Sequence, residues 1–515
     1  ICLRPKFFRL SQHILSTSGR PTILGMITNN THLDGITQRR MRQELLRQFP
    51  VMRIVNLHGN LREGEVCPDG SPDENVFDIL QGVGISVAVS PLSGADAPAD
   101  VRYCDLWGLR QKKYEELLSG AKPRWDSVVP SAPRFLLVPS VDELEEEYEL
   151  GLPVPGIFAA GVTGVQTKRD ELVFAATVAE LRTRFQSFRD GSVGMNEIRE
   201  LYGVRDIPEW KLSRAIVALK RDPDWVDSIS RCLYRPFDVK SLFYSGDFLA
   251  RDRREILRHM LRPNLALVIT RQSNPSAPWS ELFVADGLVE KRALASYSGE
   301  ARAYPLFLAD DSDQAGCSVV NVSEAAVQLF RSRLNWHVDG EADARRMFDY
   351  VYGVGHSPTF RSRFNALIKR DYLRIPITSS SDLAATLAHL GHQLIALHLL
   401  KSTKVAHPNT AFIGSRHPEV EKISWSRNTV WLDKAQTTGF QGVPEDVWNF
   451  HIGGYQVCEK WLKDRKGRTL SQDDIAHYQK IVVALSETIR LMAEIDRVID
   501  AHGGWPGAFQ ATATA

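Results

Sequence analysis

The sequence contains little cysteine, no long apolar run and almost no net charge. Its 515 residues include six cysteines, which are scattered without the close spacing of a metal site: Cys2, Cys67, Cys104, Cys232, Cys317 and Cys458. This usage argues against a disulfide framework and is typical of a reducing cytosol. No segment reaches the ~20 consecutive apolar residues of a membrane-spanning helix. The net charge of +1 excludes a uniformly basic protein, so any surface for nucleic acid must be local.

What is present is the composition of a folded protein. Hydrophobic residues make up 43% of the chain and charged residues 24%, which is enough to bury a core. The length predicts about three domains. The opening ICLRPKFFRLSQHIL is basic and apolar, but it does not have the long apolar centre of a signal peptide. We interpret it as a helix cut from a longer chain.

Residues 23–90 alternate between predicted strands and a helix. Short apolar runs predict strands at residues 23–28, 51–57 and 85–89. Apolar residues at helical spacing predict a helix that ends before Pro50. Strands that alternate with helices indicate a parallel sheet with right-handed crossovers. We therefore predict the closing half of an α/β sheet whose opening half is missing.

Polar residues follow the predicted strands at their carboxyl ends, where parallel sheets bind ligands. These residues are Asn29, Asn30, His58 and Asn60. They are our candidates for a substrate cleft. The alternative, which the sequence supports equally, is that they are turn and capping residues.

Several longer blocks occur in a fixed order. They are YCDLWGLRQKKYEELL (residues 103–118), GVQTKRDELVF (164–174), EWKLSRAIVALKRDPDW (209–225), CLYRPFDVKSLFY (232–244), ARDRREILRHML (250–261), FDYVYGVGHSPTFRSRF (348–364) and RDYLRIP (370–376). With residues 23–90, these blocks resemble the back half of adenine-specific DNA methyltransferases of the single-polypeptide, type ISP-like restriction-modification enzymes. The resemblance covers nearly the whole chain and is weakest after about residue 401.

The resemblance implies the fold class and its division into domains. We expect an α/β fold with part of a Rossmann-like methyltransferase sheet in residues 1–118. An α+β target-recognition domain would follow in residues 119–335. Residues 336–515 would form a mainly helical C-terminal part of the specificity region.

The resemblance also shows which family loops this sequence lacks. The acidic-aromatic loop for S-adenosylmethionine, with an FxGxG-like pattern, does not occur, and neither does the Asn-Pro-Pro-Tyr loop that holds the target amine. The pair Asn274-Pro275 lacks the second proline and the tyrosine. We therefore predict no catalytic residue on this chain. The spacing of its histidines and cysteines separately predicts no metal site. S-adenosylmethionine is expected as the cofactor of the intact enzyme only.

One aromatic position of the family carries over. In this group, an aromatic residue near the start of the penultimate strand stacks on the adenine that is turned out of the duplex, and ENVFDI places Phe77 there. An extruded base loses its neighbours, and a flat ring replaces the lost stacking. The alternative is that Phe77 is a core residue together with Val76 and Ile79.

The clearest basic pattern lies at residues 251–262, RDRREILRHMLR. It places four arginines at the spacing of one helical face: Arg251, Arg254, Arg258 and Arg262. Guanidinium groups in a row suit DNA phosphates, and arginine also reads guanine edges. The further DNA-contact candidates are Lys168, Arg169, Arg235, Arg271 and Gln272. The alternative interpretation is a solvated charged helix and an ordinary surface turn.

From about residue 340 the chain is predicted to be mostly helical. Residues 475–498 contain no proline or glycine and carry a heptad-like apolar stripe, which predicts a packed helix or, alternatively, a dimer arm. Residues 403–432 predict a small antiparallel sheet. His389, His392 and His398 lack the glutamate of a His-Glu-x-x-His metal site.

These predictions leave three functions open. The first is the C-terminal part of a site-specific adenine methyltransferase, joined to upstream methyltransferase, helicase or nuclease domains. The second is a non-catalytic specificity module that acts with a separate catalytic subunit. The third is a scaffold without a nucleic-acid partner. The first two predict double-stranded DNA as the partner, and we expect a prokaryotic, cytoplasmic location.

Overall fold

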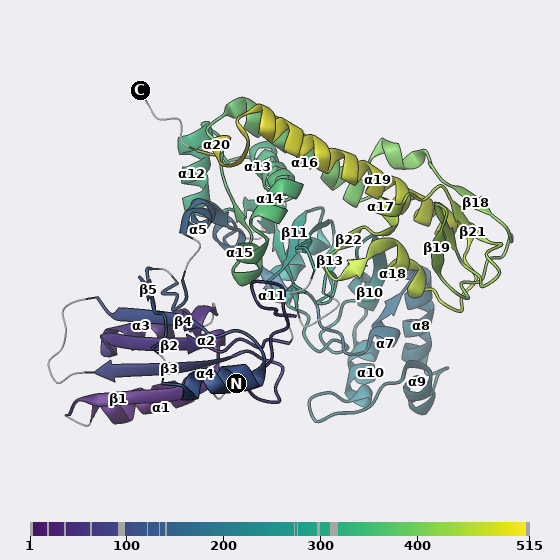
Figure 1. The fold of residues 1–515 in the computed structure, drawn as a ribbon. Coiled ribbons are helices and arrows are strands. Elements are labelled where there is room, and N and C mark those ends of the chain that lie inside the picture. Colours follow the sequence, from purple (N-terminus) through teal and green to yellow (C-terminus); the bar gives the residue numbers. More distant parts are fainter. Residues whose placement is uncertain are drawn as a thin grey trace. The chain divides into compact units, whose positions relative to one another are not determined.

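The computed structural model describes residues 4–17, 20–35, 38–61, 64–90, 98–120, 122–132, 134–139, 142–271, 273–274, 277–295, 299–309 and 318–510. The chain divides into two compact units (Figure 1). The first is Ile1–Glu147 with Pro275–Ala277, and the second is Tyr148–Asn274 with Pro278–Ala515. The three-domain division predicted from the sequence stays a prediction.

The first unit is built around one five-stranded sheet. Its elements are α1 (Arg4–Ser16), β1 (Thr22–Asn29), α2 (Thr31–Asp34), α3 (Arg39–Gln48), β2 (Val51–Asn56), β3 (Val83–Ser90), β4 (Asp100–Asp105), α4 (Arg110–Leu118), β5 (Asp126–Val128) and α5 (Asp142–Glu149), which continues into the second unit. The strand order is β1-β3-β2-β4-β5. The first three strands lie where the apolar runs predicted them.

The predicted parallel sheet is wrong, however. Only β2 and β4 pair in parallel, while β3 runs antiparallel to both β1 and β2, and β5 runs antiparallel to β4. β3 lies between β1 and β2, and the described residues between β2 and β3 contain no helix that could form the crossover of a parallel pair. Apolar runs show that a strand exists, but they do not show its direction. The fold is thus mixed α/β.

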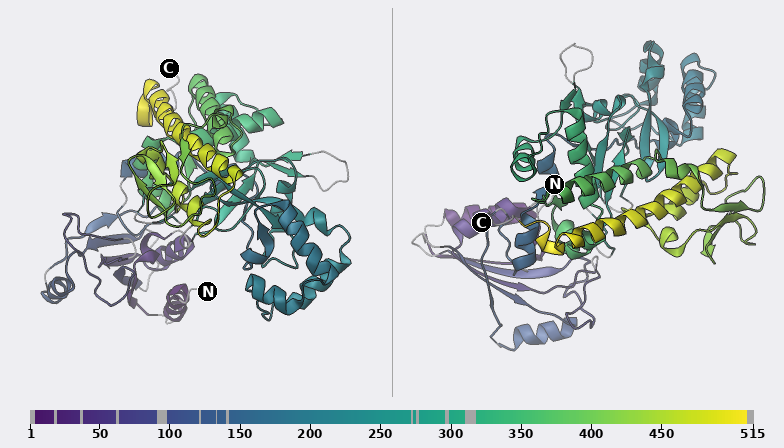
Figure 2. Two further views of the ribbon diagram at one scale, coloured as in Figure 1. Left: turned by 90° about the vertical axis from the view of Figure 1, so that its right-hand side faces the viewer. Right: turned by 90° about the horizontal axis from the view of Figure 1, so that it is seen from above.

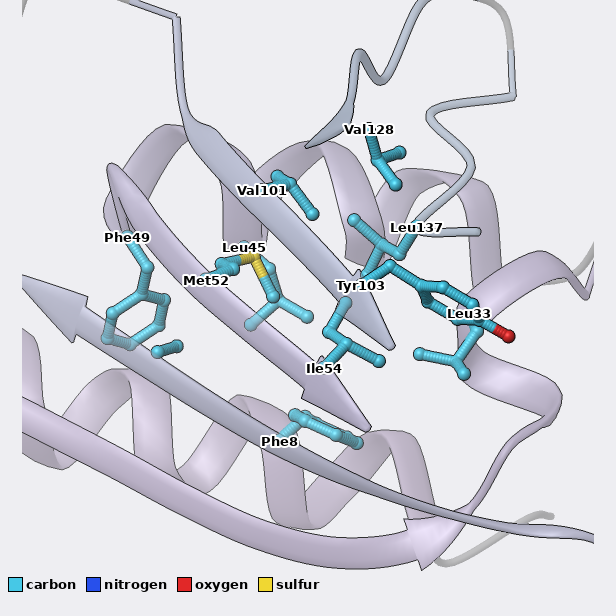
Figure 3. Packing of buried hydrophobic residues seen from close by; sticks show 11 residues of the cluster. Phe8, Leu33, Leu45, Phe49, Met52, Ile54, Val101, Tyr103, Val128 and Leu137 are labelled. Carbon is cyan, nitrogen blue, oxygen red and sulfur yellow. The ribbon is translucent and has the colours of Figure 1, made fainter. Parts of the chain in front are cut away.

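The core of this unit lies between one face of the sheet and helices α1 and α3 (Figure 3). Residues in β2 alternate between partly buried and buried positions, as expected for a strand packed on one face. Met52 and Ile54 therefore point into the core, where Leu45 and Phe49 from α3 and the turn after it meet them. Phe8 of α1 completes the cluster.

The second unit begins with short strands and helices. They are β6 (Leu152–Pro153), α6 (Val154–Ile157), β7 (Val162–Thr163), α7 (Asp170–Val173), β8 (Phe174–Ala175), α8 (Val178–Asp190), α9 (Met195–Tyr202), α10 (Leu212–Arg221), η2 (Trp225–Ser228), β9 (Ile229–Arg235), β10 (Asp238–Phe243), α11 (Arg254–Leu257), η3 (Arg258–Leu261), β11 (Ala266–Thr270), β12 (Leu282–Ala285), β13 (Leu288–Val289), β14 (Ala301–Pro305), β15 (Phe307–Ala309) and β16 (Ser318–Val320). Two four-stranded sheets organise this part, β13-β9-β10-β8 and β12-β11-β14-β7.

Helices dominate the remainder. The elements are α12 (Glu324–Leu334), α13 (Glu341–Val354), α14 (Pro358–Arg363), α15 (Asn365–Arg370), β17 (Arg374–Ile375), α16 (Ser381–His398), η4 (Thr403–Ala406), β18 (Ala411–Ile413), β19 (Ser424–Ser426), β20 (Thr429–Trp431), β21 (Gly439–Gln441), α17 (Glu445–Trp448), β22 (His451–Ile452), β23 (Tyr455–Gln456), α18 (Val457–Lys463), α19 (Gln472–Ala501) and α20 (Gly504–Gly507). The predicted long helix and the predicted small sheet are present as α19 and as β18-β21-β20-β19.

Helix α16 packs against α13 and against the long helix α19, which is the yellow helix of Figure 2. The backbones of α13 and α16 approach closely at two glycines. A Cβ atom on Gly391 would lie 1.9 Å from the carbonyl oxygen of Asp349, and one on Gly353 would lie 2.4 Å from that of Leu387. The segment Ser381–Ala406 is long and apolar enough to cross a membrane, but 56% of its apolar window is buried here, as in a core helix.

Candidate nucleic-acid interface

An exposed lysine forms the tip of a tight turn after β7. Lys168 is exposed and has a φ of 57°, a left-handed conformation that directs the chain sharply back. Two residues earlier, Gln166 pairs with Arg251 through both backbone groups, at 2.9 and 3.0 Å. Arg251 is also exposed. Two cations that were predicted from separate blocks of the sequence thus lie on adjoining segments.

The neighbouring Arg169 has a different environment. It is only 8% exposed, and its guanidinium lies 3.7 Å from the ring centre of Trp210. It donates to the carbonyl oxygens of Thr167 and Phe248 at 3.3 and 3.2 Å. Burial lowers the pKa of Arg169. These contacts fix the turn that carries Lys168, and they argue against a direct DNA contact by Arg169.

The continuous helix predicted at residues 251–262 is wrong. Arg251 belongs to the pairing with Gln166, and Arg253 has a φ of 56°, so a helix begins only at Arg254. That helix, α11, ends at Leu257, and the 3-10 helix η3 continues to Leu261. A 3-10 segment has three residues per turn, so side chains at α-helical spacing do not share one face. All four predicted arginines are nevertheless exposed: Arg251, Arg254, Arg258 and Arg262.

Arg235 lies in a cluster of cations and aromatic rings on β9 and β10. Its side chain is 13% exposed and pairs with Glu290 at 2.8 Å. Burial raises the pKa of Glu290, while the charge of Arg235 opposes that shift. The ring of Tyr234 lies 4.0 Å from the Arg235 guanidinium and 3.8 Å from the Lys240 ammonium. Cations beside an aromatic ring are attracted to its face.

Sequence reasoning missed several members of this cluster. They are Lys240, Tyr455, Lys460, Trp461 and Arg465. Arg465 lies 3.5 Å from the ring centre of Trp461 and pairs with Asp238 at 3.0 Å, across 227 positions of sequence. No local pattern connects such distant positions. The alternation of Tyr234, Arg235 and Lys240 along β9 and β10 was the one signal that could have indicated part of the cluster.

Four polar atoms of this cluster are buried without a hydrogen-bond partner among the described residues. They are Nε of Arg235, Oδ2 of Asp238, Nε1 of Trp461 and Nε of Arg465. Buried polar groups in native proteins are nearly always paired with protein or water.

The last two predicted contacts follow β11. Arg271 is half-buried, and its guanidinium lies 5.6 Å from the ring centre of Tyr372. Gln272 lies outside the described residues. The structure therefore places Lys168 and Arg251 on adjoining segments, whereas Arg235 and Arg271 lie beside aromatic rings elsewhere.

In the first unit, the predicted cleft residues take part in a hydrogen-bonded network of loops. His58 lies between two carboxylates and donates to Glu65 and Asp105, each at 2.7 Å. Its ring stacks on Trp107 with a centre distance of 3.3 Å. Burial lowers the pKa of His58, but hydrogen bonds to Asp105 and Glu65 and their negative charges outweigh it and raise the pKa above 6.5.

The asparagines have similar partners. Asn29 is 8% exposed and donates to Gln81 at 3.2 Å, and Asn30 donates to Asn56 at 3.2 Å. The backbone amide of Asn60 donates to Glu65 at 2.8 Å, while its Oδ1 is buried without a partner among the described residues. These bonds connect distant segments, and Asn30, at the N-cap of α2, makes no side-chain capping bond. A substrate role for these four residues stays a prediction.

Phe77 lies on a loop that this network holds in place. Its side chain is 47% exposed, so it is not the core residue that the alternative required. The backbone amide of Phe77 donates to Asn75 at 2.9 Å, and Asn75 in turn donates to the carbonyl oxygens of Gly59 and Gln81 at 2.9 and 2.7 Å. Tyr114 of α4 holds the carbonyl oxygen of Val76 at 2.6 Å. An exposed aromatic ring on a braced loop suits stacking, which itself stays a prediction.

A protein-family comparison identifies most of the second unit. Residues 156–494 match the model of the Type ISP C-terminal specificity domain. The chain belongs to this family. No curated protein sequence matches the chain significantly. The match includes Lys168, Arg235 and Arg251, whereas Phe77 and the His58 network lie outside it.

Solved structures of similar fold match nearly the whole of this chain. The DNA-bound ATP-dependent Type ISP enzyme LlaBIII gives a TM-score of 0.64 at 19% identity and covers 95% of this chain and 33% of its own. The DrdV–DNA complex gives a TM-score of 0.62 at 19% identity and covers 95% of this chain and 51% of its own. A nuclease-deletion mutant of the Type ISP enzyme LlaGI, in complex with a DNA substrate mimic, gives a TM-score of 0.57 at 16% identity and covers 92% of this chain and 39% of its own. The chain thus spans between a third and about half of these proteins, and the likeness concerns the fold.

Proposed function

We propose that this chain supplies DNA target recognition to a Type ISP restriction-modification enzyme. The observation that carries the proposal is the backbone pairing of Gln166 with Arg251, which puts the exposed residues Lys168 and Arg251 on adjoining segments within the family match. Exposed cations on a rigid backbone suit contacts to phosphates, which fix a protein's register on the duplex. The solved relatives of this fold are DNA complexes.

The experiment measures how salt changes the binding of mixed-sequence duplex DNA to the 515-residue chain. Each neutralised phosphate contributes a slope of about 0.9 in log affinity against log salt, so removing two contacts should flatten the slope by about 1.8. Between 50 and 200 mM salt, the variant Lys168→Ala/Arg251→Ala should therefore lose about 12-fold less affinity than the parent.

A matched control removes two positive charges elsewhere in the second unit. Lys434 and Arg497 have side chains that are 73% and 70% exposed. Lys434→Ala/Arg497→Ala should leave the slope unchanged. If the two double variants change the slope equally, the contact is general attraction between charges, and the proposed face is wrong.

We further propose that the intact enzyme methylates adenine with S-adenosylmethionine and that Phe77 stacks on the extruded base. The support is the exposed ring on a braced loop beside the strand ends. At these strand ends the described side chains bond to one another, and the chain has no glycine-rich acidic-aromatic loop. We therefore assign no cofactor-binding residue here. The cofactor, when bound, supplies the methyl group.

The open edge of the sheet supports a larger protein. Strand β1 lies at the end of the strand order and exposes Ile23 at 69% and Ile27 at 58%, while α1 exposes Phe7, Leu10 and Ile14 at 54–58%. A long apolar edge strand left uncovered is an aggregation hazard. We propose that a further methyltransferase segment covers it, in a prokaryotic cytoplasm.

The same edge keeps the second candidate function open, because a separate catalytic subunit could cover it as well. Extending the chain upstream in its reading frame distinguishes the two. If the extension encodes an Asn-Pro-Pro-Tyr loop and its product shields Ile23 and Ile27 from solvent in hydrogen exchange, the single-polypeptide proposal holds. If the extension encodes no such loop and its product leaves Ile23 and Ile27 exposed, the chain is a specificity module.

A further inference from the structure

The second unit contains a cavity of about 230 Å3 that reaches the surface. Residues of β9, β10, β12, the end of α16 and α19 line it. Val239 and Arg231 at its edge are exposed, with Val239 at 38%. One water occupies roughly 30 Å3 in the liquid, so the space admits a small ring system.

Two bulky residues that line the cavity have an unfavourable backbone. Phe237 has a φ of 60° and Leu400 a φ of 55°. Large side chains rarely adopt this conformation, which persists only where the surroundings enforce it and which clusters at ligand sites. His477 enforces it at Phe237, since its Nε2 donates to the Phe237 carbonyl oxygen at 2.8 Å. The backbone amide of Leu400 is held by the Leu397 carbonyl oxygen at 2.9 Å.

The interior wall is aromatic and uncharged. The ring of Phe283 stacks on His398 with a centre distance of 5.1 Å, and Phe237 meets Phe283 edge-on at 5.3 Å. Both nitrogens of His398 have partners, with Nδ1 accepting from Tyr352 at 2.5 Å and Nε2 bonded to Thr488 at 3.0 Å. Burial lowers the pKa of His398 to about 3, so the imidazole stays neutral. Such walls favour a flat ring.

The rim is positively charged. Arg231 and Lys480 lie there and are exposed. The carboxylate of Asp286 at the same rim is paired with Lys401 at 2.7 Å and with Arg231 at 3.7 Å, so its negative charge is compensated. A ligand that fits both the aromatic interior and the positively charged rim carries a planar ring and an anionic group. The aromatic interior disfavours a bare anion, and the rim disfavours a cation.

We propose that this cavity binds a nucleotide, with the base between the aromatic walls and the phosphate at Arg231 and Lys480. The source is either a free nucleotide or a nucleotide unstacked from bound DNA, since both present the same chemistry. The site shares none of its residues with the DNA face at Lys168 and Arg251. Each proposal can therefore fail without the other.

The test measures binding of two ligand types to the full chain by calorimetry and thermal unfolding: the free nucleotides dAMP, dGMP, dCMP and dTMP, and a DNA duplex with one unpaired nucleotide. Nucleosides and inorganic phosphate serve as comparison ligands. Val239→Trp fills the mouth of the cavity, and Val217→Trp is the matched control on the exposed face of α10, where Val217 is 48% exposed. Arg231→Ala/Lys480→Ala removes the rim charges without enlarging any side chain, so it serves even if the tryptophan variant does not fold.

At least one nucleotide should bind more tightly than its nucleoside and than phosphate. Its affinity should fall about tenfold or more in Val239→Trp and in the rim variant, a loss of about 1.4 kcal/mol, and stay unchanged in Val217→Trp. If only a duplex with an unpaired nucleotide shows this sensitivity, the source is DNA. Three outcomes overturn the proposal. The first is that neither the free nucleotides nor the duplex binds, and the second is that they bind no more tightly than phosphate. The third is that Val239→Trp and the rim variant leave the affinity unchanged.

Discussion

One buried ion pair should dominate the stability of the loops at the strand ends in the first unit. The ammonium of Lys113 lies 2.7 Å from Oδ1 of Asp73, and both side chains are 0% exposed. Lys113 also donates to the carbonyl oxygens of Leu57 and Glu74 at 2.7 and 2.6 Å. It therefore connects α4 to the end of β2 and to the loop that leads to Phe77.

The expected magnitudes follow from what each substitution leaves behind. Breaking a buried pair costs about 3–5 kcal/mol, because one charge stays buried without its partner. In Lys113→Met the Asp73 carboxylate keeps two backbone donors, Gly59 at 2.7 Å and Gly108 at 2.8 Å, so we expect a loss of about 3 kcal/mol. In Asp73→Asn the ammonium keeps carbonyl partners only, so we expect about 5 kcal/mol.

The assay is native-state hydrogen exchange of peptides from residues 51–120, which reports this unit separately from the second. Lys112→Met is the matched control, since Lys112 is exposed on the same helix, and it should change the free energy of unfolding by less than about 0.5 kcal/mol. The double variant Asp73→Asn/Lys113→Met should lose less than the sum of the single losses. Additive losses, or a Lys113→Met effect as small as the control, would refute the reasoning.

Three further predictions concern the two units. Because the pKa of His58 is raised in the folded state, protonation of His58 stabilises the fold fully below pH 6.5, and this stabilisation should disappear as the pH rises through the folded pKa. The urea midpoint should therefore fall less steeply with rising pH above 6.5 in His58→Gln than in the parent. Equal slopes in the two proteins would contradict this. Arg169→Ala should lower stability by about 2 kcal/mol through lost contacts to Trp210 and two carbonyl oxygens, with the salt slope of DNA binding unchanged in the folded fraction. The 515-residue chain should not transfer labelled methyl groups to DNA, whereas in a full-length enzyme Phe77→Ala should weaken transfer by about 1–3 kcal/mol and Phe77→Trp should restore most of it; transfer by the chain alone, or no effect of Phe77→Ala, would exclude these roles.

The positions of β1, β2 and β3 could be predicted because each contains a short run of mainly apolar residues. The direction of β3 could not be predicted. It depends on which neighbours the strand joins, and these lie up to 68 positions away, as the pair Thr22–Ser90 shows. A rule that converts alternating strands and helices into a parallel sheet does not apply to β2 and β3, because the described residues between them form no helix.

The arginine helix failed for a related reason. The spacing of its four arginines fits an α-helix, but contacts distant in sequence fix the backbone before one can form. Arg251 is held by Gln166, and the next carbonyl oxygen, that of Asp252, accepts a hydrogen bond from Tyr244 at 2.8 Å. Helix propensity is a weak preference that such tertiary contacts override.

The same distinction separates two residues that the sequence presents as equivalent. Lys168 and Arg169 are adjacent cations in one turn, and pattern analysis gives both the same role. Burial assigns them opposite ones, because Arg169 uses its donors to hold the turn and Lys168 extends from its tip. Loss of the buried cation should therefore appear as lost stability, and loss of the exposed one as weaker salt dependence. Reversed results would mean that this turn does not approach DNA as a rigid element.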